Sequence, residues 1–166
     1  MHEIFKRRSI RKYLDKPVAK EDIDDLLRAA MAAPSAGNEQ PWEFIVVDDK
    51  NVLKRIADVH PYAKMLYEAP VAIVVCGDLN KEKYKGFWVQ DCSAATQNIL
   101  LEATDKGLGT VWIGVYPDDT RVKDISNIFG IPSNVIPLSI VAVGYPAQEM
   151  QEVDRFDPQK IHYNKW

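Results

Sequence analysis

The sequence lacks any apolar run long enough to cross a membrane. Its longest strongly apolar stretches, residues 70–76 and 137–144, fall far short of the roughly 20 residues that a spanning helix needs. No apolar segment follows the basic residues near the N-terminus, so we expect no secretory signal. These absences exclude a membrane protein and favour a cytoplasmic one.

Cysteine and histidine are also scarce. The two cysteines, Cys76 and Cys92, lie inside apolar segments and form no CxxC pair, which favours a structural role in a reducing compartment. The histidines His2, His60 and His162 are scattered, and no HExxH motif or Cys/His cluster is present, so we predict no metal site. The P-loop motif and the GxSxG elbow of serine hydrolases are absent too.

What is present describes one ordinary globular domain of 166 residues, 46% hydrophobic and 27% charged, without internal repeats. Helices and strands alternate, which predicts an α+β fold. Apolar spacing of three and four predicts helices over residues 3–7, 20–33, 51–59 and 87–106, and one capped by Asp118 or Asp119 that ends at Phe129. Runs of β-branched and aromatic residues predict strands over residues 42–47, 71–76, 110–115 and 138–143.

The longest predicted helix, residues 87–106, is apolar on more than one face. Trp88, Cys92 and Ile99 share one face, while Ala94 and Leu101 point elsewhere. Such a helix is buried on several sides, and in a domain this small one of those sides can be a second subunit.

A basic segment stands out in a chain whose net charge is −3. Residues 6–12 read KRRSIRK, with five cations and no acid. In an extended segment Arg7, Ser9 and Arg11 point to one side, which would place two guanidinium groups and a hydroxyl around one phosphate. The alternative is a solvated basic terminus. The acidic balance of the rest of the chain argues against a nucleic-acid partner.

A second polar segment, APSAGNEQPW, follows the first long helix as residues 33–42. Ser35, Asn38 and Gln40 both donate and accept hydrogen bonds, so they could read the edge of a planar heterocycle. The alternative is an ordinary loop between a helix and a strand, where the same residue types are common.

The segment GLGTVWIG, residues 107–114, mimics a dinucleotide-binding motif. It lacks the third glycine, and it follows a predicted helix and opens a strand, whereas the motif follows a strand and opens a helix. We therefore reject that interpretation. Gly114, at the end of the predicted strand, lets a backbone approach a ligand closely.

Taken in order, RRSIRKY, APSAGNEQPW, GLGTVWIG and the closing DRFDPQKIHYNKW resemble the FMN-dependent nitroreductase family, over essentially the whole chain. The resemblance implies a single nitroreductase-like domain over residues 1–166, with a central, mostly antiparallel mixed sheet flanked by helices. It also implies a homodimer with FMN at the interface. Residues 146–166, a tail that carries aromatic side chains, are then expected to dock on the partner subunit.

The family's cofactor-binding positions transfer to this sequence motif by motif. The residues that would hold the phosphate are Arg7, Arg8, Ser9, Arg11 and the late Arg155. The loop that reaches the flavin from the partner subunit corresponds to Pro34, Ser35, Ala36, Asn38 and Gln40. The segment at the strand end, against the ring, corresponds to Trp112, Ile113 and Gly114. Lys64 is a weaker candidate near the pyrimidine edge.

The resemblance implies an oxidoreductase that passes electrons from NADH or NADPH through FMN to a nitroaromatic, a quinone or a similar acceptor by a ping-pong scheme. Because the chemistry belongs to the flavin, no catalytic side chain is assigned. Only Tyr116 and Pro117 separate the strand end from the next helix, so we expect a reduced lid and broad substrate choice. Three alternatives remain: a reductive dehalogenase-type or flavin-degrading variant, a non-catalytic module that stores or senses flavin, and a basic-armed binding protein without a cofactor.

Overall fold

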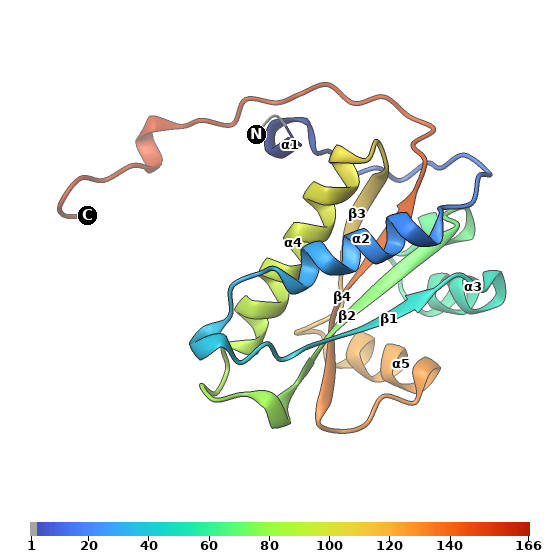
Figure 1. Ribbon diagram of the computed structural model, residues 1–166, viewed down its shortest axis with the longest axis horizontal. Coiled ribbons are helices and arrows are strands. Elements are labelled where there is room, and N and C mark those ends of the chain that lie inside the picture. The colour runs from blue at the N-terminus through green and yellow to red at the C-terminus, as the bar shows by residue number, and fades with distance from the viewer. Residues whose placement is uncertain (1–2) are drawn as a thin grey trace.

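The computed structural model describes residues 3–166, which form a four-stranded sheet between two layers of helices (Figure 1). The strands lie in the order β1-β2-β4-β3, and every neighbouring pair is antiparallel. Their bounds are β1 Trp42–Val47, β2 Val71–Asp78, β3 Gly109–Gly114 and β4 Val135–Gly144. The helices are α1 Glu3–Lys6, α2 Lys20–Met31, α3 Lys50–Val59, α4 Trp88–Asp105 and α5 Asp119–Phe129.

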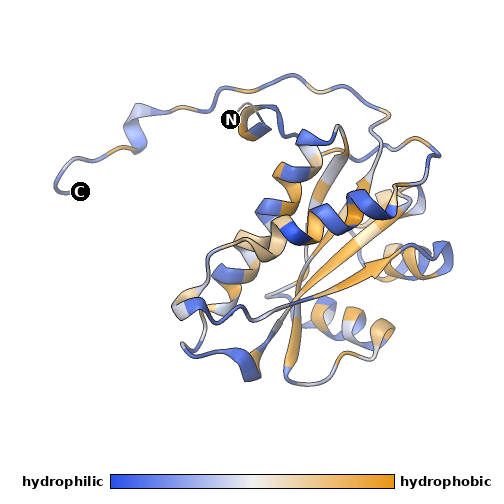
Figure 2. Ribbon diagram, in the orientation of Figure 1, coloured by the Kyte–Doolittle hydropathy of each residue, from blue (hydrophilic) through white to orange (hydrophobic). Residues whose placement is uncertain are grey.

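Both faces of the sheet are covered, and this explains the unbroken apolar run of β2. Alternate side chains of a strand point to opposite faces. Val71, Ile73 and Val75 pack with α2 and α4, whereas Ala72 and Val74 pack with α3 and α5. Figure 2 shows the same arrangement, with hydrophobic strands inside and hydrophilic residues along the outer sides of the helices.

The predicted elements are all present, and their ends differ by a few residues. Strand β4 begins at Val135, three residues before the predicted start, and it continues through Pro137. Pro137 lies opposite Cys76, where the register between β2 and β4 shifts, and a proline is tolerated at such an irregularity. Of the two candidate caps of α5, Asp118 is the one that accepts a hydrogen bond from the N–H of Arg121, at 3.0 Å.

Within one chain helix α4 is fully buried on one face only, so its predicted burial on several sides stays a prediction. Cys92 and Ile99 are buried among the side chains between the sheet and α2, whereas Ala94 and Leu101 on other faces are half-buried. Both cysteines are unpaired and buried, and burial raises the pKa of Cys76 to about 12, so its thiol is unreactive. Their predicted structural role is confirmed.

The basic N-terminal segment is held against one end of the sheet. The N–H of Ile10 donates to the carbonyl of Thr110 on β3, at 2.8 Å, and Ser9 forms one parallel bridge with the same residue. Gly109 and Gly144 lie opposite each other on β3 and β4. A Cβ atom on Gly109 would lie 2.7 Å from Ile10, so the lack of a side chain permits this close approach.

Beyond β4 the chain leaves the body of the domain and runs extended past α1 to the C-terminus (Figure 1). Its aromatic side chains are strongly exposed, Phe156 at 73%, Tyr163 at 80% and Trp166 at 99%. The docking of residues 146–166 on a partner stays a prediction. No helix within residues 3–166 is long and apolar enough to span a membrane.

Candidate functional site

The outer edge of β3 is the starting point of the candidate site. Val115 donates its N–H to Leu138 of β4 at 3.0 Å, whereas the carbonyl of Thr110 faces away from β4 and accepts from Ile10. Backbone groups alternate between the two edges of an antiparallel strand. The N–H and C=O groups of Trp112 and Gly114 therefore face the outer edge, beyond the point where the N-terminal segment covers it.

A cavity of about 460 Å³ lies along this edge. Such a volume suits a small-molecule or cofactor site. It brings together several residues predicted from the sequence and others that were not: Arg11, Pro61, Tyr62, Lys64, Met65, Val111, Trp112, Ile113, Gly114 and Arg121. A Cβ atom added to Gly114 would meet nothing within 4 Å, so the space beside this residue is open.

Four arginines without acidic partners gather near the N-terminal segment. Partial burial is the main cause that lowers the pKa of Arg7, and the positive charges of Arg8 and of Arg155, from the other end of the chain, lower it further. The Nε atom of Arg8 is buried and has no hydrogen-bond partner. No ion pair within residues 3–166 joins these three residues or Arg11 to a carboxylate. A bound anion would satisfy both the charges and the free donor.

The expected alternation of Arg7, Ser9 and Arg11 along one extended segment is wrong for the first of them. The N–H of Arg7 donates to the carbonyl of Glu3 at 2.8 Å, so Arg7 closes the last turn of α1. Only Ser9 and Arg11 lie on the extended part, where the Arg11 guanidinium donates to the Ser9 carbonyl at 3.4 Å. A local helical hydrogen bond overrides the period-two pattern here.

The predicted ring-reading loop, residues 34–40, is folded tightly on itself around the short helix η1, Ala36–Asn38. Ser35 Oγ accepts from the N–H of Gln40 at 3.0 Å, and the amide of Gln40 donates to Asn38 Oδ1 at 2.7 Å. Gly37 has a positive φ, and a Cβ atom there would lie 2.4 Å from the Tyr84 ring, so only glycine fits. The loop is therefore preorganised.

Two buried carboxyl groups brace this loop. Asp91 accepts from the N–H of Ala36 at 2.9 Å, and Glu39 accepts from the N–H groups of Lys83 and Tyr84 at 2.6 and 3.0 Å. Burial raises the pKa of Asp91, whereas the hydrogen bonds from Tyr84 and Lys83 outweigh burial and lower the pKa of Glu39. The remaining oxygen of each carboxyl group is buried without another partner. One proton on Asp91, directed at Glu39, satisfies both oxygens.

The loop and the cavity belong to opposite edges of the sheet in one chain. Residues 34–40 lead into β1, and β3 is the other edge strand. Three strand spacings, about 14 Å in all, separate these edges. None of the five predicted residues Pro34, Ser35, Ala36, Asn38 and Gln40 lines the cavity. The chain thus brings Arg11, one of the predicted phosphate residues, to the same cavity as the predicted strand-end residues, and it holds the predicted loop elsewhere (Figure 1).

His60 was not predicted as a site residue, because the sequence analysis considered the histidines only as metal ligands. Its side chain is 1% exposed, and its Nε2 atom lies 2.9 Å from the carbonyl oxygen of Gly114. Nothing in the sequence indicates this pairing, because 54 positions separate the two residues. Lys64 was predicted, and its ammonium group donates to the carbonyl of Ala57 at 2.6 Å near the end of α3.

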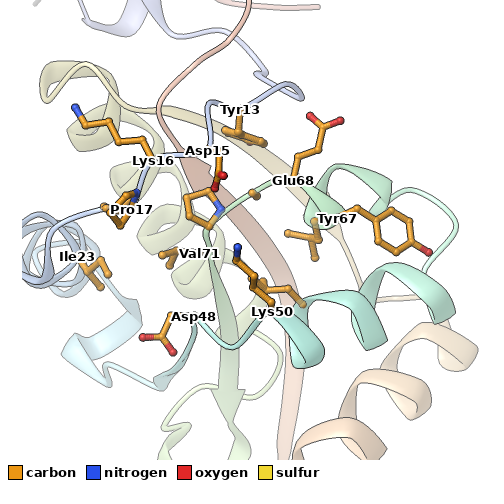
Figure 3. A pocket seen from close by; sticks show the side chains of 15 residues that line it. Tyr13, Asp15, Lys16, Pro17, Ile23, Asp48, Lys50, Tyr67, Glu68 and Val71 are labelled. Carbon is orange, nitrogen blue, oxygen red and sulfur yellow. The ribbon is translucent and has the colours of Figure 1, made fainter.

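A larger cavity of about 660 Å³ lies between the segment 13–18, α2, α3 and the start of β2 (Figure 3). Its charged side chains have both signs: Asp15, Lys16, Asp48, Lys50 and Glu68. None of the residues predicted for cofactor binding lines it. We therefore place the candidate site at the edge of β3, in the smaller cavity.

Comparison with known proteins shows which family this chain resembles over most of its length. The chain matches the nitroreductase family over residues 4–60 and 58–145. A Methanothermobacter thermautotrophicus protein named "Putative NADH dehydrogenase/NAD(P)H nitroreductase" is 54% identical to it over 100% of this chain and 87% of that protein. A Bacillus subtilis protein named as an FMN reductase with NAD(P)H is 29% identical over 99% of this chain and 74% of that protein.

Solved structures share the fold. An FMN-dependent nitroreductase from Clostridium difficile superposes with a TM-score of 0.91 at 37% identity, and the match covers 100% of both chains. The α+β class expected from the sequence and the nitroreductase-like sheet flanked by helices that the resemblance implies are confirmed, although the four strands are all antiparallel rather than mixed. The chain belongs to the nitroreductase family.

Proposed function

We propose that this protein is an FMN-dependent oxidoreductase that takes electrons from NADH or NADPH and delivers them to a nitroaromatic, a quinone or a similar acceptor. The observation that carries the proposal is that Arg11, which no ion pair among residues 3–166 joins to a carboxylate, lines one cavity together with the open edge of β3. Family members named for NAD(P)H nitroreductase and FMN reductase activities support the reaction class.

The arginine group suits the phosphate of FMN. Arg7, Arg8 and Arg155 gather positive charge without an acidic partner, and Arg8 Nε is a buried donor that lacks an acceptor. Hydrogen bonds between charged groups contribute about 1.5–3 kcal/mol each. We assign Ser9 and Arg11, on the adjoining extended segment, to the same phosphate.

The outer edge of β3 suits the polar rim of the flavin ring. Trp112 turns its backbone N–H and C=O toward the cavity and Gly114 turns its N–H there, and the buried side chain of Ile113 fixes the strand between them. Lys64, which also lines the cavity, is placed to stabilise negative charge on the pyrimidine side. Bound FMN supplies the redox chemistry, and the protein orients it. No side chain is assigned as a general acid or base.

We propose a ping-pong order, and the shape of the site supports it. One cavity at an open edge offers a single face to both the nicotinamide and the acceptor, so each would occupy it in turn. The link from β3 to α5 spans only Val115 to Asp118, which leaves little material for a lid. We therefore expect broad acceptor choice.

A second copy of the chain would complete the site. The loop of residues 34–40 is preorganised, yet it lies on the sheet edge opposite the cavity of its own chain. Helix α4 keeps a half-buried face with Ala94 and Leu101, and the exposed aromatic tail extends away from the domain. We propose a homodimer in which the loop and tail of one copy reach the other.

The test is the visible spectrum of the purified protein with added FMN, before and after addition of NADH or NADPH. A bound flavin that is bleached by the nicotinamide and reoxidised by a quinone supports the proposal. Bound flavin without turnover would indicate a storage or sensing module. Riboflavin is the matched control ligand, because it lacks the phosphate, and we expect it to bind more weakly than FMN.

A further inference from the structure

His60 connects the loop after α3 with the last residue of β3. Its ring is buried, with Nε2 at 2.9 Å from the carbonyl oxygen of Gly114 and Nδ1 at 3.2 Å from the backbone nitrogen of Tyr62. Both ring nitrogens are therefore engaged by the backbone. A histidine held at both nitrogens has a fixed orientation and a fixed tautomer.

The hydrogen-bond partners identify that tautomer. The N–H of Tyr62 can only donate, so Nδ1 must accept and carry no proton. Nε2 then carries the proton and donates to Gly114. Burial is the largest effect on the pKa of His60 and lowers it, which favours this neutral ring. The hydrogen bond with Gly114 acts in the opposite direction but is outweighed, and the nearby charge of Arg121 lowers the pKa further.

This hydrogen bond decides what the end of β3 presents to the cavity. The N–H and C=O of Gly114 both face the outer edge of the strand. The carbonyl is occupied by His60, so the N–H is the polar group of this residue that stays available. Val115 holds the following peptide through its bond to Leu138 of β4, at 3.0 Å.

We propose that His60 is a positioning residue that masks the Gly114 carbonyl and so makes the end of β3 a hydrogen-bond donor toward the ring of the bound flavin. The inference rests on the proposed function, because the ligand is FMN. Without the imidazole, the glycine carbonyl would face the cavity as a competing acceptor. A flavin ring atom that accepts from the Gly114 N–H would then be repelled by the nearby Gly114 carbonyl oxygen.

The experiment compares His60→Leu with His60→Gln. The glutamine amide can donate to Gly114 as the imidazole does, whereas leucine fills similar space and cannot donate. We expect His60→Leu to weaken FMN binding about tenfold, measured by quenching of flavin fluorescence. We expect His60→Gln to restore most of the affinity. Ile125→Val, a change at a buried core residue that does not itself line the cavity, is the control for a general loss of stability.

A measurement without cofactor tests the contact itself. Nitrogen chemical shifts of the His60 ring in the apoprotein should report a protonated Nε2 and an unprotonated Nδ1 at neutral pH. Amide exchange over residues 112–116 should accelerate in His60→Leu and stay slow in His60→Gln. The opposite tautomer in the wild-type protein would overturn the inference even if the leucine variant does not fold.

The outcomes separate this inference from the proposed function. If the wild-type protein binds FMN and a folded His60→Leu variant binds it equally well, only the role of His60 is wrong. If the wild-type protein binds no flavin, the proposed function fails and this inference fails with it.

Discussion

Replacing Gly109 by alanine tests how the basic segment is held on the sheet. The new Cβ atom would lie 2.7 Å from Cγ2, 2.9 Å from Cβ and 3.0 Å from Cγ1 of Ile10. Favourable carbon–carbon contacts lie at about 3.5–4.0 Å. Because the Ile10 Cβ atom is fixed to its backbone, the segment must lift, which strains the 2.8 Å hydrogen bond from Ile10 to Thr110. Overpacking of this kind costs about 1–3 kcal/mol of the free energy of unfolding.

The assay is urea unfolding of the apoprotein, with the slope checked for two-state behaviour. Gly114→Ala is the matched control, since it makes the same change on the same strand where a Cβ atom meets nothing within 4 Å. We expect the control to be neutral or to gain up to about 1 kcal/mol, because alanine restricts the unfolded chain. Combining Gly109→Ala with Ile10→Ala should recover part of the loss relative to the sum of the single changes.

Ligand binding by the same variant provides a second test. Lifting the segment displaces Ser9 and Arg11, so Gly109→Ala should lose affinity for FMN more than for riboflavin. Equal stability of Gly109→Ala and Gly114→Ala would refute the reasoning, because it would show that the close contact with Ile10 relaxes at no cost.

Four further predictions concern the site. Arg7→Ala and Arg11→Ala should each weaken FMN binding about tenfold or more in a fluorescence titration, and unchanged affinity in both would remove the phosphate assignment. Asp91→Asn should change the urea midpoint little, because the amide replaces the shared proton, whereas Asp91→Ala should lose about 1–3 kcal/mol. Burial holds the pKa of His60 below its ordinary 6.5, so below pH 6.5 the unfolded chain binds more protons than the folded one. The free energy of unfolding, measured by urea titration, should therefore fall as the pH drops below 6.5. The His60→Gln variant should lack this fall. Sedimentation should show a dimer, and a monomer that holds FMN tightly would contradict a site built from two chains.

The order and type of the secondary-structure elements could be predicted from the sequence, because periodicity is a local property. Alternation along β2 and spacings of three and four along α2 record which side of each element is buried. The element ends were less predictable. Pro137 continues β4 because it falls at the register shift opposite Cys76, and that partner comes from another part of the chain.

The sequence by itself determined the candidate chemistry of the site, because the arginine-rich segment, the polar loop and the glycine at a strand end can be recognised from their residue types alone. Only the tertiary structure decided which of these residues lie close together. It gathers Arg7 with Arg155, joins His60 to Gly114, pairs Glu39 with Asp91, and puts the polar loop on the far edge of the sheet. The physical reason is that such contacts depend on strand order and packing between segments distant in the chain, which no local pattern records.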